Sequence, residues 1–474
     1  MTQSVSSPTH PAFETFSSTF RGTLIRRGEA GYDGARAVWN AAADDLRPAL
    51  IARPQDAAGV AQAVRHAVAQ GLPLAVRGGG HSPAGFGTVQ DGLVIDLRGM
   101  KGLQIDPASR HVRLEPGLTW GEVAGALQVH GLAITAGDVA AVGVGGLTQG
   151  GGIGWFVRQY GLAVDRLRAA ELVTARGDLL RVSETEHPEV FWALRGAGAN
   201  LGVITALEFE SHPAGLIYGG LLAFAADEPA EAARLMGDFA RLALQAPDAL
   251  TMQGVFMAAP PAPFVPPHLV GTTIFAVFSC YSGELGGAPA AFAPLRALGH
   301  AAIDLTGPMP YPALFEMTAE AAMGGFRHAI RSGFLPELTP GALLALGHEI
   351  QVMQPGMIVQ LRPLGGQLAR VPDSATAFSH RRAPFLLMVS QAVPDASLDD
   401  LAWATTERLW APFAAQSSGL YGNFVGERDR EPARAAFTAR TLERVARIKA
   451  GLDPDNVFSR TVNVRPAVPE LVGR

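Results

Sequence analysis

Apolar residues in the first half of the chain follow helical spacing in two places. From Asp56 to Gly71 they recur every three to four positions, which predicts a helix that Asp56 caps and Gly71 ends. The stretch 119–131 predicts a second helix, which ends at Gly131. The first prediction rests on its capping residue, its apolar stripe and its closing glycine, and the second on its closing glycine.

Short apolar runs around these helices predict strands. The runs 72–77 and 93–97 predict two strands, the first of them buried, and 111–117 alternates apolar and polar residues as a third strand does. The stretch 169–182 predicts a hairpin, and 201–210 predicts the last strand of this region. Helices and short strands alternate, which indicates an α/β unit.

The sequence changes in character after about Gly215. Proline-rich connections such as 258–268 separate apolar runs such as 272–281 and 342–350, which predicts a second domain. From about Tyr421 the tail returns to a charged pattern, and a helix is predicted within 440–458 that a glycine ends.

Composition narrows the class of protein. Of 474 residues, 48% are apolar and 17% are charged, which fits a globular protein. The net charge of −5, without long Lys/Arg blocks, argues against a nucleic-acid partner and favours a small molecule.

A single cysteine, Cys280, leaves no intrachain disulfide and no cysteine-built metal site, and this favours a reducing compartment. The N-terminus lacks the pattern of a signal peptide, and no apolar run approaches the roughly 20 residues that cross a bilayer. We expect a cytoplasmic protein without a membrane partner and without a bound metal.

Two glycine-rich stretches carry the candidate chemistry. The first, RGGGHSPAG (77–85), allows three interpretations: a serine nucleophile at Ser82, a phosphate cradle, or a histidine held against a cofactor. The serine interpretation is weakened because Ala84 stands where a nucleophile elbow has its second glycine. Neither a Walker lysine nor a dinucleotide fingerprint aligns with these glycines.

The second stretch, 137–167, has nine glycines in 31 residues. Glycines at this density let backbone N–H groups approach a ligand closely. Either stretch alone could be a structural turn, but together they predict the two sides of a site for one extended anionic cofactor.

Several motifs in order resemble a known family. RGGGHSPAG, GVGGLTQGGGIGWFVRQYGLAVDRL and FWALRGAGANLGVITALEFE resemble the flavin-binding domain of the vanillyl alcohol oxidase superfamily, and specifically the berberine bridge enzyme-like FAD-linked oxidases. GYDGARAVWN, GGQLARVPDSATAFSHR, DPDNVF and VNVRP extend the resemblance over nearly the whole chain.

The resemblance implies an α+β fold of the PCMH type, with a two-lobed FAD-binding domain and an inserted substrate domain whose antiparallel sheet is covered by helices. We expect a flexible N-terminus (1–18), the FAD-binding domain (19–214), the substrate domain (215–420) and a C-terminal segment (421–474) that returns to the FAD-binding domain. The segment 375–381 is expected as a strand of the substrate sheet, and Trp155 and Phe156 either line the substrate cavity or pack in the core.

The resemblance also implies which residues hold FAD. His81 is expected to bond covalently to the 8α-methyl group of the flavin, and Val142 to leave room for oxygen beside it. The residues expected to contact FAD otherwise are Arg77, Gly78, Gly79, Gly80, Ser82, Gly137, Gly145, Gly146, Gly152, Val203 and Asn463.

Two departures from the family change the expected chemistry. Val139 stands where many relatives have a cysteine bonded to the flavin, so a single covalent link is expected. Phe424 stands where relatives that oxidise alcohols have a proton-accepting tyrosine, which leaves Tyr421 and Asn423 as catalytic candidates. For Tyr421 a packed aromatic role is the alternative.

The expected activity is hydride transfer from an alcohol or amine carbon of a small substrate to FAD, with reoxidation by molecular oxygen and release of hydrogen peroxide. A flavin dehydrogenase or oxidative cyclase with another acceptor is the alternative of the same class. A serine hydrolase acting through Ser82 is the alternative of a different class. The sequence leaves the substrate and the oligomeric state open.

Overall fold

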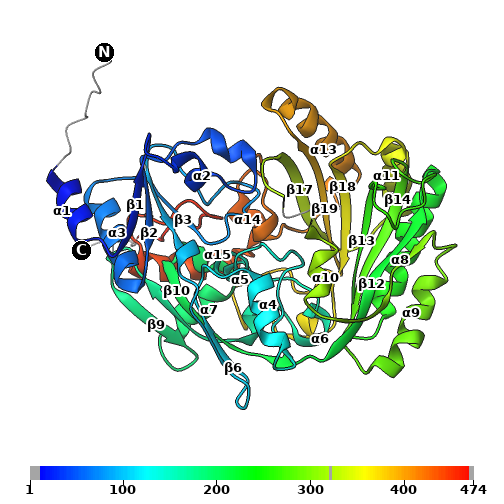
Figure 1. The fold of residues 1–474 in the computed structure, drawn as a ribbon, viewed down its shortest axis with the longest axis horizontal. Coiled ribbons are helices and arrows are strands. Elements are labelled where there is room, and N and C mark those ends of the chain that lie inside the picture. Colours follow the sequence, from blue (N-terminus) through cyan, green and yellow to red (C-terminus); the bar gives the residue numbers. More distant parts are fainter. Residues whose placement is uncertain (1–10, 320–322, 469–474) are drawn as a thin grey trace, which may run out of the picture.

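The computed structural model describes residues 11–319 and 323–468. Figure 1 shows two small sheets with their helices on one side and one large sheet on the other. The first sheet has the order β1-β2-β4-β3, in which β2, β4 and β3 are parallel. Its strands are β1 (Gly22–Arg26), β2 (Leu50–Pro54), β3 (Leu74–Arg77) and β4 (Leu93–Asp96).

The second sheet is antiparallel, with the order β5-β6-β10-β8-β9. Its strands are β5 (Leu103–Asp106), β6 (His111–Leu114), β8 (Leu167–Val173), β9 (Leu179–Ser183) and β10 (Val203–Glu210). The helices α4 (Trp120–Gln128) and α7 (Pro188–Ala197) contribute apolar side chains to the same core as this sheet, and α15 (Ala439–Leu452) packs on α7.

The third sheet is antiparallel and forms the right half of Figure 1. Its order is β15-β12-β14-β13-β18-β19-β17, and β16 pairs with β12. The helices α8 (Pro229–Gln245), α11 (Pro340–Glu349) and α13 (Asp399–Ala414) share a core with it. Its strands are β12 (Leu216–Ala225), β13 (Leu250–Ala258), β14 (Thr273–Tyr281), β15 (Ile303–Asp304), β16 (Gly307–Pro310), β17 (Arg327–Leu335), β18 (Met357–Pro363) and β19 (Phe385–Val393).

The two predicted helices are present, but they end two and three residues before Gly71 and Gly131. α3 (Ala57–Ala69) begins at Asp56, whose carboxylate accepts the Gly59 N–H at 2.9 Å. α4 begins with a reciprocal cap between Thr119 and Glu122, which satisfies two backbone donors at once. The hairpin β8/β9 and the strand β10 also lie where the sequence predicts them.

Three local expectations differ from the structure. Residues 11–18 were expected in a flexible N-terminus but belong to helix α1 (Pro11–Thr19), because Phe16 is buried and stacks on His66; residues 1–10 lie outside the described part of the chain. The segment 375–381 is not a strand of the large sheet, since its backbone bonds to α7 instead. α15 continues through Gly451 and ends at Leu452.

Buried arginines connect the smaller sheets with the large one. Arg158 donates to the carbonyl groups of Leu364 and Ala246, and Arg381 forms a buried ion pair with Asp165 at 2.7 Å. No helix within 11–319 or 323–468 is long and apolar enough to cross a membrane. We keep 19–214, 215–420 and 421–474 as the proposed domain division.

Candidate active site

The two glycine-rich stretches lie directly against each other. A methyl group on Gly79 would collide with the backbone of Gly143, and one on Gly143 would collide with the backbone of Gly79. Gly78 faces the nitrogen of Gly146 across the same contact. Only glycine permits this approach, so the first loop (78–82) and the second loop (137–152) form one structure.

The first loop presents backbone donors without protein partners. None of the N–H groups from Gly78 to Ser82 has an acceptor among residues 11–319 and 323–468. A side chain on Gly146 would meet open space, so this part of the second loop is accessible to a ligand. Successive unpartnered N–H groups bind anions, and this arrangement fits the pyrophosphate of FAD.

Buried side-chain atoms of the second loop also lack partners. Thr148 Oγ1 and Gln149 Oε1 are buried and have no hydrogen-bond partner within the described ranges. Such atoms cost free energy unless a ligand satisfies them. The loop therefore fits a polar ligand such as the ribityl chain and ring edge of FAD.

His81 lies at the end of the first loop, largely buried. Burial disfavours the imidazolium form and lowers the pKa of His81 to about 4, so the ring is neutral at pH 7. Its ring nitrogens have no hydrogen-bond partner in the part of the chain that the structure describes, and its ring stacks on Trp39 at 5.7 Å. A neutral imidazole with an available nitrogen fits the covalent role expected for His81.

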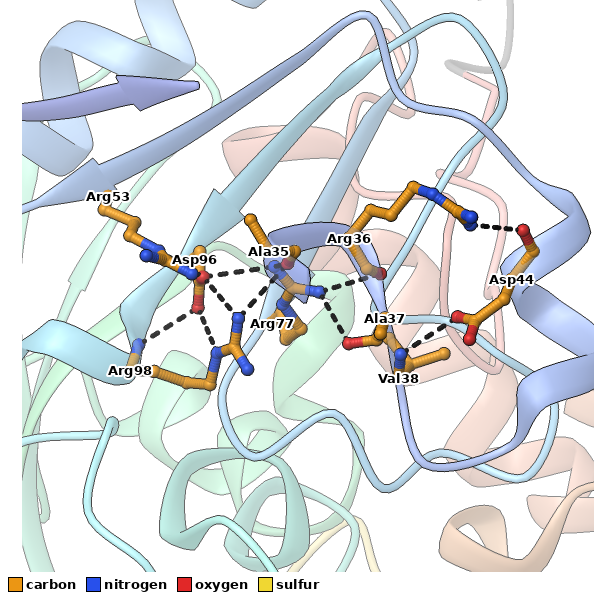
Figure 2. A network of polar contacts seen from close by, with 9 residues as sticks. All are labelled: Ala35, Arg36, Ala37, Val38, Asp44, Arg53, Arg77, Asp96 and Arg98. Atoms are coloured by element: carbon orange, nitrogen blue, oxygen red, sulfur yellow. Dashed lines mark hydrogen bonds and ion pairs between the residues drawn. The ribbon is translucent and has the colours of Figure 1, made fainter. Parts of the chain in front are cut away.

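The Arg77 guanidinium points to residues 35–37 and Asp96, as Figure 2 shows, while the stem of its side chain packs against Gly80. Its guanidinium group donates to the carbonyl groups of residues 35–37 and to Asp96 at 3.1 Å. The expected contact between this side chain and FAD has no support in this geometry, because the guanidinium is committed to the protein. Arg77 instead fixes the segment that leads to Trp39.

Asp96 collects three guanidinium groups, from Arg53, Arg77 and Arg98. Burial alone would raise the pKa of the Asp96 carboxyl, but the hydrogen bonds from Arg98 and the charge of Arg77 hold it well below its ordinary value. The fully ionised carboxylate ties the end of β3 to the end of β4, and so fixes where the first loop begins.

Tyr421 and Asn423 contact the second loop through hydrogen bonds. The Tyr421 hydroxyl oxygen accepts the N–H groups of Gly152 at 3.1 Å and Ile153 at 3.3 Å, and the Asn423 side-chain amide at 2.8 Å. Asn423 also donates to the carbonyl of Leu147 at 3.0 Å. Burial raises the pKa of Tyr421. The geometry supports a positioning role for both, and proton transfer by either stays a prediction.

The remaining predicted residues are distributed over both loops and the C-terminal segment. Val142 shapes the second loop, since its N–H donates to Val139 and its carbonyl accepts from Trp120. Val203 is buried at the start of β10, and Asn463 accepts a hydrogen bond from the buried Lys449 at 3.2 Å. The other glycines are in close packing: Gly137 faces Leu147, Gly145 faces Pro116 and Gly152 faces Ala163.

A polar network that the sequence analysis missed joins the second loop to the large sheet. Asp138 pairs with Arg362 of β18 at 2.6 Å, Arg362 donates to Gln360 at 2.8 Å, and Gln360 donates to Gln253 of β13 at 2.9 Å. The Arg362 guanidinium lies 5.1 Å from the centre of the Phe424 ring. Polar residues alternate with apolar ones in VQLRP (359–363), a signal that could have identified Gln360 and Arg362 on one strand face.

A cavity of about 20 Å³ lies beside this network. Asp138, Trp155, Gln253 and Arg362 contribute to its lining, and Trp155 and Phe156 both belong to the buried apolar core. Of the two aromatic residues considered from the sequence, Trp155 therefore borders the cavity. Both lobes and the large sheet contribute to the site.

Comparison with known proteins gives the same assignment. Residues 48–183 match a family of FAD binding domains. (R)-6-Hydroxynicotine oxidase of Paenarthrobacter nicotinovorans is 41% identical over 192 residues, which are 40% of this chain and 42% of that protein. An FAD-linked oxidoreductase of Dictyostelium discoideum is 26% identical over 95% of this chain and 96% of its own length.

The fold matches solved structures over their whole length. The crystal structure of 6-hydroxy-D-nicotine oxidase from Arthrobacter nicotinovorans is 27% identical, with a TM-score of 0.85 over 95% of this chain and 99% of that one. The chain therefore contains an FAD binding domain, and over nearly its whole length it is similar to FAD-linked oxidases, in agreement with its resemblance to the berberine bridge enzyme-like group.

Proposed function

We propose that the protein is an oxidase that removes a hydride from a carbon bearing an alcohol or amine group of a small organic substrate. The substrate loses two hydrogens, and molecular oxygen receives them as hydrogen peroxide. The observation that supports it most is the neutral His81 ring at the end of the first loop: within residues 11–319 and 323–468, neither its ring nitrogens nor the loop N–H groups have a hydrogen-bond partner. The similarity to 6-hydroxynicotine oxidase supports an amine or alcohol substrate.

FAD is held in this proposal by one covalent bond, from His81. Glucooligosaccharide oxidase of Acremonium strictum, which shares the fold at 22% identity over 97% of this chain and 100% of that one (TM-score 0.85), has a 6-S-cysteinyl, 8α-N1-histidyl FAD. This chain has Val139 in the second loop and a single cysteine, Cys280, which is buried in β14. We therefore propose no second covalent bond between a cysteine and the flavin.

When bound, FAD supplies hydride acceptance and electron transfer to oxygen. The residues of the chain bind the cofactor and orient it. The N–H groups of the first loop hold the anionic part of the cofactor, and Tyr421 with Asn423 holds the second loop in place. The Asp138 carboxylate and the Gln253 side chain border the small cavity beside the second loop, and both have oxygen atoms that accept hydrogen bonds.

Phe424 has no group that accepts a proton. An amine in its neutral form needs little base assistance to lose a hydride, whereas an alcohol must lose its O–H proton. Asp138 is the carboxylate that borders the cavity, where it is paired with Arg362. The geometry thus supports amines, and alcohols through Asp138.

The hydrolase alternative loses support. The Ser82 hydroxyl oxygen accepts the N–H of Phe86 at 3.3 Å, and no imidazole in the described part of the chain is hydrogen-bonded to it. A nucleophilic serine needs such a base within hydrogen-bond reach. A flavin dehydrogenase or cyclase would use the same site and differ only in its electron acceptor or product.

The test is a peroxide assay on the purified protein with 6-hydroxynicotine as an amine probe and a glucooligosaccharide as an alcohol probe. We expect the flavin to bleach with one probe class without oxygen and to release one peroxide per turnover with oxygen. Bleaching without peroxide in air would assign a dehydrogenase. A protein purified without any flavin would overturn the proposal.

A further inference from the structure

We propose that Trp39 and His328 are positioning residues for covalent attachment of FAD to His81, because they hold the His81 ring in one plane through a stack of three aromatic rings. This inference rests on the proposed covalent link. It concerns how the link forms and not the oxidation of substrate.

The three rings come from three distant parts of the chain. The Trp39 indole lies 4.0 Å from the His328 imidazole with an angle of 18° between the rings, and 5.7 Å from the His81 imidazole with an angle of 20°. His81 belongs to the first loop, and His328 belongs to β17, the edge strand of the large sheet. The indole thus lies parallel to both imidazoles and between two domains.

Hydrogen bonds of Trp39 and Asn40 fix this stack from both sides. The side-chain amide nitrogen of Asn40 donates to the carbonyl of Pro83 at 2.7 Å, and its amide oxygen accepts the backbone N–H of His328 at 2.9 Å. The backbone N–H of Trp39 donates to the carbonyl of Gly80 at 3.0 Å. One residue pair, Trp39 and Asn40, therefore connects the loop of His81 to the strand of His328.

The segment of Trp39 is itself anchored. Arg77 donates to the carbonyl groups of residues 35–37, and the Ala41 N–H donates to Phe326 at 2.8 Å. The indole is therefore held at both ends of its segment, and a shift of Trp39 would break several contacts at once. A ring held this firmly can fix the plane of a neighbour.

The His328 ring is held by stacking and not by a side-chain hydrogen bond. Its Nε2 atom is buried and has no partner within the described ranges. Burial, with a smaller contribution from nearby His81, lowers the pKa of His328 to about 4, so both imidazoles are neutral and do not repel each other at pH 7. A flat, neutral side chain is what this position requires.

Covalent attachment requires that the plane of the His81 ring is held. One C–H bond of the flavin 8α-methyl group and one N–H bond of the His81 ring are replaced by a C–N bond; the two protons and two electrons released pass to molecular oxygen as hydrogen peroxide. The His81 imidazole must be neutral, and its reacting nitrogen must face the 8α carbon. A free imidazole rotates about two bonds, and holding its plane removes this rotation before the reaction.

The experiment measures how much flavin stays with acid-precipitated holoprotein, relative to total bound flavin. The variants are Trp39→Ala, Trp39→Phe, His328→Ala and His328→Phe. The matched control is His66→Ala, because His66 also stacks on an aromatic ring, Phe16, at 4.0 Å in the same lobe but away from His81. Thermal unfolding is recorded for each protein.

We expect the alanine variants at positions 39 and 328 to show a covalent fraction lower by about ten-fold or more, at unchanged total flavin. The phenylalanine variants, which keep a flat ring, and the control should stay near wild type. Wild-type covalent fractions in folded alanine variants, or phenylalanine variants as poor as alanine, would overturn the inference. If Trp39→Ala does not fold, the covalent fraction in His328→Ala decides whether the inference holds.

The two proposals fail differently. Acid-releasable flavin in the wild type would refute the His81 link, and the inference with it. An acid-stable flavin in the wild type and in both alanine variants would support the His81 link and refute only the role of Trp39 and His328 in forming it.

Discussion

The carboxylate of Asp138 in the second glycine loop lies 2.6 Å from the guanidinium of Arg362 on the large sheet. Both side chains are largely buried, and both border the small cavity. Asp138 directly precedes Val139, the position at which many relatives have a flavin-bonded cysteine. An ion pair between the second loop and the large sheet therefore lies directly beside Val139.

Breaking this pair should be costly. Arg362→Met leaves the Asp138 carboxylate buried and uncompensated, and we expect a loss of about 3–5 kcal/mol in the free energy of unfolding. The double variant Asp138→Asn, Arg362→Met removes both charges and should recover most of the loss. Urea unfolding monitored by tryptophan fluorescence measures both. Equal stability of the wild type and Arg362→Met would show that the pair is solvated.

The contact between Gly79 and Gly143 predicts a cofactor defect. Gly79→Ala places a methyl group against the Gly143 backbone, which forces the two loops apart. We expect purified Gly79→Ala to contain a several-fold lower amount of flavin per protein. Gly125→Ala is the matched control, because an added methyl group there meets no atom within 4 Å and the site is within α4. A normal flavin content in Gly79→Ala would refute the assignment of the cradle.

Local features of the fold could be predicted from the sequence because short-range interactions determine them. Asp56 and Thr119 cap helices through contacts within three residues, and the glycine density of the two loops follows from backbone approach. The expected strand at 375–381 failed because Phe378 bonds to Arg195 of α7, a partner that no local pattern specifies.

The missed site residues are those whose meaning depends on a distant partner. His328 is 288 positions from Asn40, and Arg362 is 224 positions from Asp138. Alone, each is an ordinary polar residue on a strand. Only the edge-strand contact with residues 40–41 and the inward face of β18 bring them to the cofactor loops.

Tyr421→Phe separates a positioning role from proton transfer. The change removes the oxygen that accepts the N–H groups of Gly152 and Ile153, and the two buried donors then cost about 1–3 kcal/mol. We expect lower stability with kcat reduced only modestly. A fall in kcat of about 100-fold or more at unchanged flavin content would instead assign Tyr421 to proton transfer.

The histidine stack predicts how stability depends on pH. The pKa of His328 falls from 6.5 to about 4 on folding, so between these values the unfolded chain binds more protons than the folded one. Its contribution to the free energy of unfolding is therefore complete above pH 6.5 and is lost as the pH falls toward 4, by a few kcal/mol. Other buried histidines such as His212 contribute in the same direction.

We expect His328→Phe, which keeps the ring but removes the titrating nitrogen, to show a shallower loss of stability from pH 6.5 to pH 4.5 than the wild type. Urea unfolding at several pH values measures both slopes, and identical slopes would mean that His328 is protonated as easily in the folded protein as in the unfolded chain.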